Sequence, residues 1–505
     1  MIQAMKRRTE KNYPGRRIAS RLGTRDSPVV RPLSHPSGKV FTFADTLTPQ
    51  LGPRVNDLHR IRVSYCTTCH GRLWQLAQTF FDNLDRLRED EEIVLLDYGS
   101  PDGLARFVDS SQRCRDAINR GQLTYVYTEA ERHHCSRAKN LSHRMGRGDI
   151  LVNLDADNSN AGMRAVIDEH FPGRIDDVVV HMDDGAAGAF GRICIPRYWF
   201  YTLGGYDESF APSSYQDRDL LKRAAASGLR YFRAPSDSPP PIPNTIQEKV
   251  SHTGEENWHA MRATNREISD TNLREGRLVA NAQGWSGAKV RINFGEELNL
   301  APILPNLISV VLRGSRRLSQ VNELLELYNQ MLLVGEILVV NNHSRLPIEK
   351  SERIDSKVTV VNAGGSLRSL SRVAVAAQAS YSAVLLTEDK IFLPEWTLTE
   401  LHKGWWIDPS ILHGVVSDGQ TLAGSRRKPV APCEIMPTRA VLTTAYDCFR
   451  SLCFASDRVP RKSRGNREDI LLSYAVMSAA QRPNMAYWLP VEELSSRARA
   501  AYRSV

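Results

Sequence analysis

Between residues 61 and 157, short apolar segments alternate with segments of helical periodicity, and this alternation is the feature that most limits the possible folds. Each predicted strand is a short, nearly continuous apolar run, which is typical of strands buried on both faces. The sequence therefore predicts an α/β domain in which helices cover both faces of a mostly parallel sheet. The predicted strands are 61–66, 93–96, 123–127 and 150–154, and the predicted helices are 72–84, 104–119 and 135–145.

Acidic residues follow the second and the fourth of these strands, at Asp97 and at Asp155-Ala156-Asp157. In open α/β sheets, ligands bind beyond the carboxyl ends of the strands. Asp155 and Asp157 are two residues apart, so in an extended segment their side chains leave the same face and can meet one hard cation. The sequence predicts a site for Mn²⁺ or Mg²⁺ here, with the Pro-rich loop 235–243 on the same side.

The same pattern starts again after residue 306, which suggests that an α/β unit is duplicated and that the second copy has diverged. A chain of 505 residues also exceeds what one hydrophobic core usually serves. We predict a basic flexible tail at 1–57, a catalytic domain at 58–295 and a diverged second domain at 306–495. The strands predicted in the second copy are 307–312, 336–340, 358–361 and 383–386, and its helices are 318–328 and 367–377.

Most of the net charge of +9 comes from the first 60 residues, which hold 12 Lys or Arg against 4 acidic residues, a net +8. This stretch is rich in Pro, Ser and Gly, so it predicts a solvated tail rather than a nucleic-acid-binding domain. Alternatively, the tail is a polybasic arm that makes weak contact with anionic lipid or an acidic glycan. No apolar run reaches membrane-spanning or signal-peptide length, so we expect a cytoplasmic protein, or one peripheral to the inner face of the membrane.

The eight cysteines include the spacing Cys66-Thr67-Thr68-Cys69-His70. This spacing matches a haem-attachment motif and also a redox pair, but without an export signal we favour an ordinary turn from a strand into a helix.

Residues 63 to about 266 resemble the family 2 glycosyltransferases and the related galactosyl- and N-acetylgalactosaminyltransferases of the GT-A fold. The resemblance implies two tandem GT-A-type α/β domains if the second copy is included. It rests on segments that occur in the expected order, namely 66–72, Asp97-Tyr98-Gly99-Ser100, 136–140, 148–157, Gly204-Gly205-Tyr206-Asp207-Glu208 and 215–220.

The resemblance implies a UDP-sugar donor carrying a hexose or N-acetylhexosamine, a glycan acceptor, and an inverting, metal-dependent reaction in polysaccharide or glycoconjugate biosynthesis. Asp217 matches the general base and Asp219 is the second candidate, while Gln216 stands where the family often has Glu. Metal ligands implied by the resemblance are Asp155, Asp157 and His252. Donor-binding residues implied in the same way are Thr67, Arg72, Asp97, Arg137, Asn140, Asp155 and Gly205.

Structural roles remain open for several of these residues. Asp217 and Asp219 could instead lie in the first turn of a helix and stabilise it, since Asp is common there. His252 could be a structural histidine, and Arg137 and Lys139 could be surface positions of a helix instead of diphosphate ligands.

The second copy faintly resembles the exostosin-like transferase domain through Glu388-Asp389 and Glu468-Asp469. Lys390 falls where that family places an Asp, and a cation repels a metal. The second copy therefore either retains a site based on these acids or serves acceptor binding or packing.

Two other classes of function remain as alternatives to a glycosyltransferase. A catalytically silent nucleotide-sugar or glycan-binding protein could be built on the same fold. A nucleotidyltransferase shares the α/β architecture, but it would normally carry a Gly-rich basic loop after its first strand, and 66–72 contains one glycine.

Overall fold

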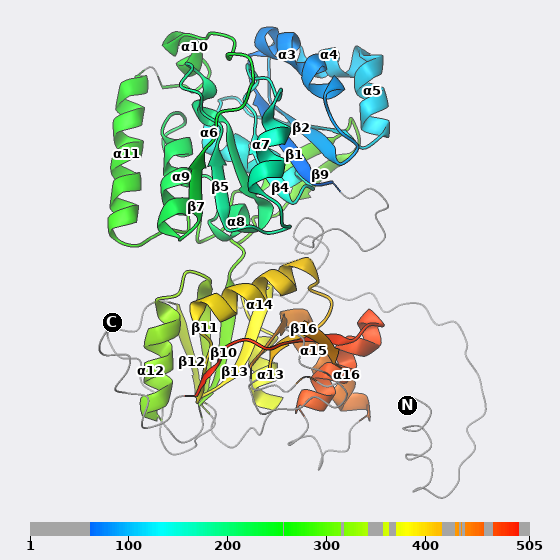
Figure 1. The fold of residues 1–505 in the computed structure, drawn as a ribbon, viewed down its shortest axis with the longest axis vertical. Coiled ribbons are helices and arrows are strands. Elements are labelled where there is room, and N and C mark those ends of the chain that lie inside the picture. The colour runs from blue at the N-terminus through cyan, green and yellow to red at the C-terminus, as the bar shows by residue number, and fades with distance from the viewer. Residues whose placement is uncertain are drawn as a thin grey trace, which may run out of the picture. The chain divides into compact units, whose positions relative to one another are not determined.

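The computed structural model describes residues 61–255, 257–314, 318–341, 357–362, 370–416, 430–433, 436, 440–458 and 468–493. These residues form an α/β protein with two mixed, largely parallel sheets (Figure 1). The predicted fold class is therefore confirmed. The predicted basic tail, with its proposed membrane contact, lies outside the described residues.

Within the described residues the first sheet has nine strands in the order β7-β5-β6-β4-β1-β2-β3-β8-β9. Its central strands β3, β2, β1 and β4 run parallel, and β6 joins β4 antiparallel. The strands are β1 (Val63–Cys69), β2 (Glu91–Tyr98), β3 (Leu123–Thr128), β4 (Ile150–Asn153), β5 (Val178–His181), β6 (Ile193–Pro196), β7 (Arg230–Arg233), β8 (Ala288–Ile292) and β9 (Glu297–Leu300).

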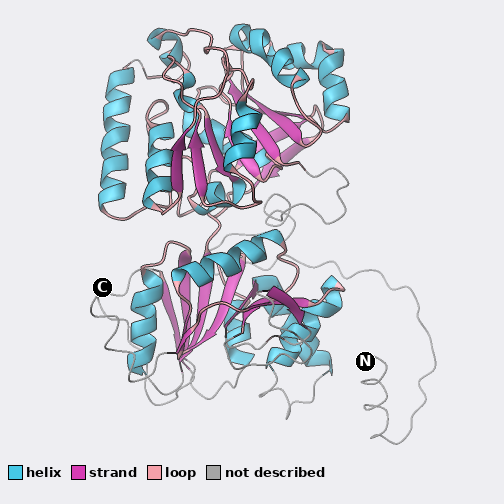
Figure 2. Ribbon diagram, in the orientation of Figure 1, coloured by secondary structure: helices cyan, strands magenta, loops and turns pink. Residues whose placement is uncertain are grey.

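Helices cover both faces of this sheet, as the continuous apolar strands predict (Figure 2). One face packs against α3, α4, α5 and α7, and the other against α6, α8 and α9. The helices are α3 (Leu73–Asp85), α4 (Leu104–Ser110), α5 (Gln112–Asn119), α6 (Cys135–Met145), α7 (Met163–His170), α8 (Arg197–Thr202), α9 (Gln216–Ala226), α10 (Ile246–Val250) and α11 (Trp258–Arg274).

The second large sheet, as far as it is described, has the order β12-β11-β10-β13-β17-β15-β18-β16, and β14 pairs separately with β19. The strands are β10 (Ile308–Gly314), β11 (Val334–Asn341), β12 (Val358–Asn362), β13 (Ala383–Glu388), β14 (Ile391–Phe392), β15 (His413–Val415), β16 (Val430–Cys433), β17 (Ala440–Thr444), β18 (Asn484–Tyr487) and β19 (Glu492–Glu493).

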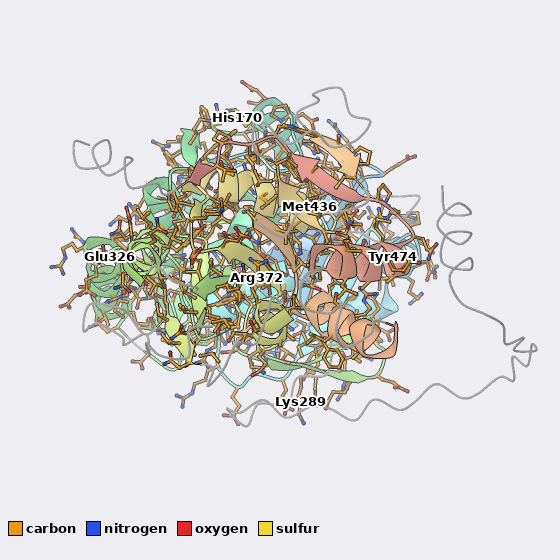
Figure 3. The ribbon with its side chains drawn as sticks, turned by 90° about the horizontal axis from the view of Figure 1, so that it is seen from below. His170, Lys289, Glu326, Arg372, Met436 and Tyr474 are labelled. Atoms are coloured by element: carbon orange, nitrogen blue, oxygen red, sulfur yellow. The ribbon has the colours of Figure 1, made fainter. Side chains whose placement is uncertain are left out.

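Its two faces pack against α12 and α14 on one side and against α13, α15 and α16 on the other. Of the residues labelled in Figure 3, Arg372 and Met436 are buried, whereas Tyr474 on α16 is half-exposed. The helices are α12 (Leu318–Asn329), α13 (Leu370–Ala376), α14 (Glu395–Ile407), α15 (Ala445–Arg458) and α16 (Glu468–Ala480).

The two sheets repeat one topology, since β12-β11-β10-β13 corresponds to β3-β2-β1-β4 and β17 pairs antiparallel with β13 as β6 does with β4. The polar contacts repeat as well. In the first sheet, Ser64 donates to Glu92 over 2.6 Å and accepts from the Gly148 N–H over 2.7 Å.

In the second sheet, Ser309 donates to Glu336 over 2.6 Å and accepts from the Tyr381 N–H over 3.2 Å. Both serines are second in their strand and directly oppose their glutamate in the parallel register. A Ser–Glu pair at the same register position of both sheets, fully buried in the first and partly buried in the second, supports the inferred duplication of one α/β unit.

Two local predictions need correction. The predicted helix 104–119 is broken into α4 and α5, because the Ser111 side chain caps α5 by accepting from the Cys114 N–H over 3.4 Å. Strand β1 runs on to Cys69, so Cys66 and Cys69 lie within it and are buried against opposite faces of the sheet. Their thiols cannot pair with each other in this strand, and burial raises the pKa of the Cys69 thiol to about 12.

Candidate active site

A cavity of about 380 Å³ opens beyond the carboxyl ends of β1 and β4. It is walled by the segment after β4, by α6, by the start of α9 and by α11. It brings together five of the residues singled out from the sequence, namely Arg72, Asp155, Asp157, Asp217 and His252. Thus residues up to 180 positions apart in the chain face one space, as the position of the acidic residues at strand ends predicted.

The Asp155-Ala156-Asp157 segment follows β4 directly and is held in place by amides. Asn153 donates to Asp155 over 3.1 Å, and Asp157 accepts from Asn158 over 2.7 Å and from Asn244 over 2.8 Å. The Pro-rich loop 235–243 lies beside this segment, as the sequence predicted, because the Ile242 N–H donates to the Asp157 carbonyl over 2.9 Å. Burial and the neighbouring Asp155 raise the pKa of Asp157.

The ammonium group of Lys139 lies between two carboxylates, 3.5 Å from Asp155 and 2.7 Å from Asp217. Burial opposes its charge, but the two carboxylates outweigh burial and hold the pKa of Lys139 well above its usual value. Burial would also raise the pKa of Asp155, but Lys139 and Asn153 lower it overall. Burial raises the pKa of Asp217 despite Lys139, so this carboxylate is a better proton acceptor than an exposed Asp.

The turn that leads into Asp217 is strained. Ser214 and Tyr215 have φ angles of 78° and 71°, a left-handed region that side-chain-bearing residues rarely adopt. The buried amide of Asn265, on α11, holds this turn. It accepts from the Ala211 N–H over 2.7 Å and donates to the carbonyls of Ala211 (3.2 Å), Ser213 (3.1 Å) and Ser214 (2.8 Å).

Strain of this kind persists only where the surroundings enforce it, and it often accompanies functional sites. Sequence reasoning missed Asn265, because nothing in its neighbourhood on α11 indicates that its partners lie about 50 residues away in the chain.

Asp219 has a structural role that differs from its prediction as a second catalytic candidate. It is fully buried, does not line the cavity, and accepts from Arg223 over 2.7 Å. Arg223 in turn donates to the carbonyls of Leu203 (2.7 Å) and Gly205 (2.6 Å). Asp219 thus holds the arginine that clamps the Gly204-Gly205 turn.

The other side of α6 carries Arg137 and Asn140, two predicted donor-binding residues. Both line a separate cavity of about 480 Å³ rather than the one that contains Asp155. Asn140 also braces the turn at Gly205, because it donates to the Tyr206 carbonyl and accepts from the Tyr206 N–H, each over 2.8 Å. A side chain at Gly205 would overlap the Asn140 amide, so this glycine serves the close packing of the turn.

Asp97 and Thr67 are buried away from the cavity that holds Asp155. Asp97 is 1% exposed, and both of its oxygens are used: it accepts from the Ser100 N–H over 2.8 Å and from the Tyr125 hydroxyl over 2.7 Å. In this structure Asp97 therefore does not present a carboxylate to a nucleobase. Thr67 does not line this cavity, whereas its neighbour Thr68 does.

His252 reaches the cavity beside a second histidine. Its ring meets that of His70 edge-on at 5.0 Å, and it occupies the space that a side chain at Gly71 would fill. No three His, Cys, Asp or Glu side chains among the described residues gather closely enough to hold a metal ion. The geometry thus does not join His252 to Asp155 and Asp157 as a ligand set.

The two carboxylates alone still fit a hard divalent cation, which prefers oxygen ligands and often completes its shell with phosphate and water. Asp155 and Asp157 both face the cavity from one short segment. A side chain at Gly191 would overlap the Asp155 carboxylate, so the backbone is kept close to this acid.

In the second sheet, the strand register identifies the counterparts of these acids. Ile150 opposes Val63 as Ala383 opposes Ile308, so Glu388 corresponds to Asp155 and Lys390 to Asp157. The predicted acids Glu468 and Asp469 begin α16, but their side chains lie outside the described part of the chain.

Residues 64–194 match the sequence model of the glycosyl transferase family 2, so this part of the chain forms a family 2 glycosyltransferase domain. The matched range contains the whole of β1 to β4 except Val63, and it includes both Asp155 and Asp157. No curated protein sequence matches the chain.

Among solved structures, the chain is similar to a mannosyltransferase from Pyrobaculum calidifontis in complex with GDP-Man and Mn²⁺. The sequence identity is 18%, the match covers 44% of this chain and 73% of that chain, and the TM-score is 0.31. It is also similar to S. aureus TarS 1-349, with 15% identity, 35% and 58% covered, and a TM-score of 0.28. A third is GalNAc-T7 with UDP, GalNAc and Mn²⁺, with 16% identity, 35% and 43% covered, and a TM-score of 0.29. The chain spans less than two thirds of the latter two proteins.

None of the helices in the described ranges combines the length and the apolar character needed to cross a membrane.

Proposed function

We propose that this protein transfers a hexose or N-acetylhexosamine from a UDP-sugar to a glycan acceptor, with inversion, in polysaccharide or glycoconjugate biosynthesis. The observation that carries the proposal is one cavity in which Asp155, Asp157 and Lys139, from the range that matches family 2, meet Asp217 from the start of α9. The cavity combines anionic groups for a cation, cationic groups for a diphosphate, and a buried carboxylate for a proton.

In this proposal Asp217 accepts the proton of the acceptor hydroxyl. The acceptor oxygen then forms a bond to the anomeric carbon, and the bond between that carbon and the diphosphate oxygen breaks. Lys139 and Arg72 line the same cavity and would donate charge-assisted hydrogen bonds to the diphosphate. A divalent cation held by Asp155 and Asp157 would supply further positive charge at the departing diphosphate.

The test is to incubate the purified full-length protein with a panel of UDP-sugars, with and without Mn²⁺, and to follow UDP release. We expect metal-dependent release from one or two donors, which Asp157→Ala and Asp217→Asn abolish. Asp168→Asn is the matched control, because this acid lies on α7, is partly exposed and pairs with Arg88 outside the cavity.

Three outcomes would separate the alternatives. If nucleotide binds in calorimetry but no donor is turned over with any acceptor, the protein is a silent nucleotide-sugar-binding protein. Formation of a nucleoside diphosphate sugar from a sugar phosphate would identify a nucleotidyltransferase instead. Absence of nucleotide binding altogether would overturn the proposal.

For the second sheet, we propose that it does not contain an equivalent metal site, because Lys390 stands in place of Asp157. A cation at this position opposes the binding of a metal. Glu388→Gln should therefore leave UDP release unchanged, and a loss of one of two donor activities in this variant would contradict the assignment.

A further inference from the structure

The order of the strands gives the cavity two ends. Strand β1 lies between β4 and β2, so Asp155 and Asp157 after β4 lie on one side of His70, and Tyr98 at the end of β2 lies on the other. His70 follows β1 directly and lines the cavity. If the diphosphate lies near the acids, a nucleoside attached to it can extend toward β1 and β2, where His70 stands.

A backbone hydrogen bond determines which nitrogen of His70 carries the proton. His70 Nδ1 lies 2.6 Å from the carbonyl oxygen of Tyr98. Because a carbonyl oxygen can only accept, Nδ1 must be the donor, and in the neutral ring Nε2 is then a hydrogen-bond acceptor. Nε2 makes no hydrogen bond to any residue in the described part of the chain.

Two further histidines hold the His70 ring in this orientation. The His133 ring stacks on it at 5.9 Å with 24° between the planes, and the His252 ring meets it edge-on at 5.0 Å. The two neighbours are themselves linked, because the His133 N–H donates to the His252 carbonyl over 2.7 Å. All three residues line the cavity, so together they make an aromatic end of the site.

Asp97 cannot serve as the acceptor at this end. Its two oxygens are engaged by Ser100 and Tyr125, and only 1% of the residue is exposed. At this end of the cavity, the Nε2 atom of His70 is therefore available as a hydrogen-bond acceptor, whereas the carboxylate of Asp97 is not.

We propose that His70 reads the nucleobase of the donor, with Nε2 accepting a hydrogen bond from a ring N–H of the base. Uracil carries such a group at N3 and guanine at N1. Cytosine N3 and adenine N1 carry lone pairs, so they would face His70 as acceptor against acceptor. The inference rests on the proposed function and names the residue that would select the uracil of its UDP-sugar against cytosine and adenine; guanine, which also carries a ring N–H, is an outcome of the test.

The test uses calorimetry on the full-length protein with UDP, GDP, CDP and ADP at constant Mn²⁺. Wild-type protein should bind UDP or GDP at least about tenfold more tightly than CDP and ADP, the size expected for one hydrogen bond made or opposed. The preference between UDP and GDP identifies which base the site accepts. His70→Phe keeps a ring but removes both nitrogens, so it should lose the discrimination against CDP.

His170→Phe is the matched control, because the Nδ1 of His170 also bonds a backbone carbonyl, that of Val166 over 3.0 Å, on α7 outside the cavity. His70→Gln restores an acceptor oxygen and should keep part of the preference, which distinguishes base reading from support of the fold.

If no nucleotide binds to the wild-type protein, the proposed function fails. If UDP or GDP binds and His70→Phe retains the full preference over CDP, His70 does not read the base, while the proposed function stands. A folded His70→Gln with no more preference than His70→Phe would also overturn the inference.

Discussion

Replacing Asn265 with Ala should destabilise the protein and disable the site together. The side chain is fully buried; its oxygen accepts from the Ala211 N–H, and its two N–H groups are shared among the carbonyls of Ala211, Ser213 and Ser214. A typical net contribution is about 1 kcal/mol for each bond, and buried partners left unsatisfied add to the loss, so we expect a loss of roughly 2–4 kcal/mol. Without the amide, Ser214 and Tyr215 are also free to leave their left-handed conformation, which would move Asp217 away from Lys139.

Urea denaturation of the variant gives the stability change, and UDP release gives the activity. Ser269→Ala is the control, since Ser269 lies one helical turn along α11, is equally buried, and its hydroxyl has no partner among the described residues. We expect this control to lie within about 0.5 kcal/mol of wild type, because no hydrogen bond is lost.

Ser214→Gly provides a second test of the same reasoning, because glycine adopts a positive φ at little cost. In the Asn265→Ala background it should restore part of both stability and UDP release. A loss of stability below about 1 kcal/mol for Asn265→Ala, well under the sum of its bonds, would refute the view that this amide holds the turn.

Three further predictions concern the surrounding turns and the buried core. Asp219→Asn should weaken the clamp made by Arg223 and cost about 1–3 kcal/mol of stability in urea denaturation, whereas a loss of UDP release with unchanged stability would indicate a catalytic role. Gly204→Ala should destabilise the protein by more than about 2 kcal/mol, because the new methyl group would overlap the Ala280 carbonyl and because residue 204 has a φ of +71°. A melting temperature equal to that of the wild-type protein would contradict this prediction. Burial lowers the pKa of His143 to about 3, so below about pH 6.5 the unfolded chain gains a proton that the folded one does not. Stability should fall as the pH drops from 6.5 toward 3. His143→Phe should make that fall less steep in urea denaturation at a series of pH values, while His133 and His402, whose pKa burial also lowers to about 3, keep their share.

The sequence by itself determined the features that depend on local periodicity. Continuous apolar runs at strand length predict buried parallel strands, and the helix 135–145 has the predicted bounds because its apolar spacing and its flanking residues are all local. The position of Asp155 and Asp157 directly after a strand was sufficient to place them at the edge of the sheet. The repeated strand order was also visible in the sequence, because the second set of apolar segments follows the spacing of the first.

Only the tertiary structure decided which polar side chains are available to a ligand. The carboxylate of Asp97 accepts a hydrogen bond from Tyr125 on the neighbouring strand β3. The carboxylate of Asp219 accepts from Arg223, which also donates to the Gly204-Gly205 turn. Asn265 supports a turn about 50 residues away. An Asp or an Asn is the same letter in the sequence whether its side chain faces a cavity or forms a hydrogen bond with a buried polar group. The difference arises only when distant segments pack together, because burial obliges each polar group to find a partner.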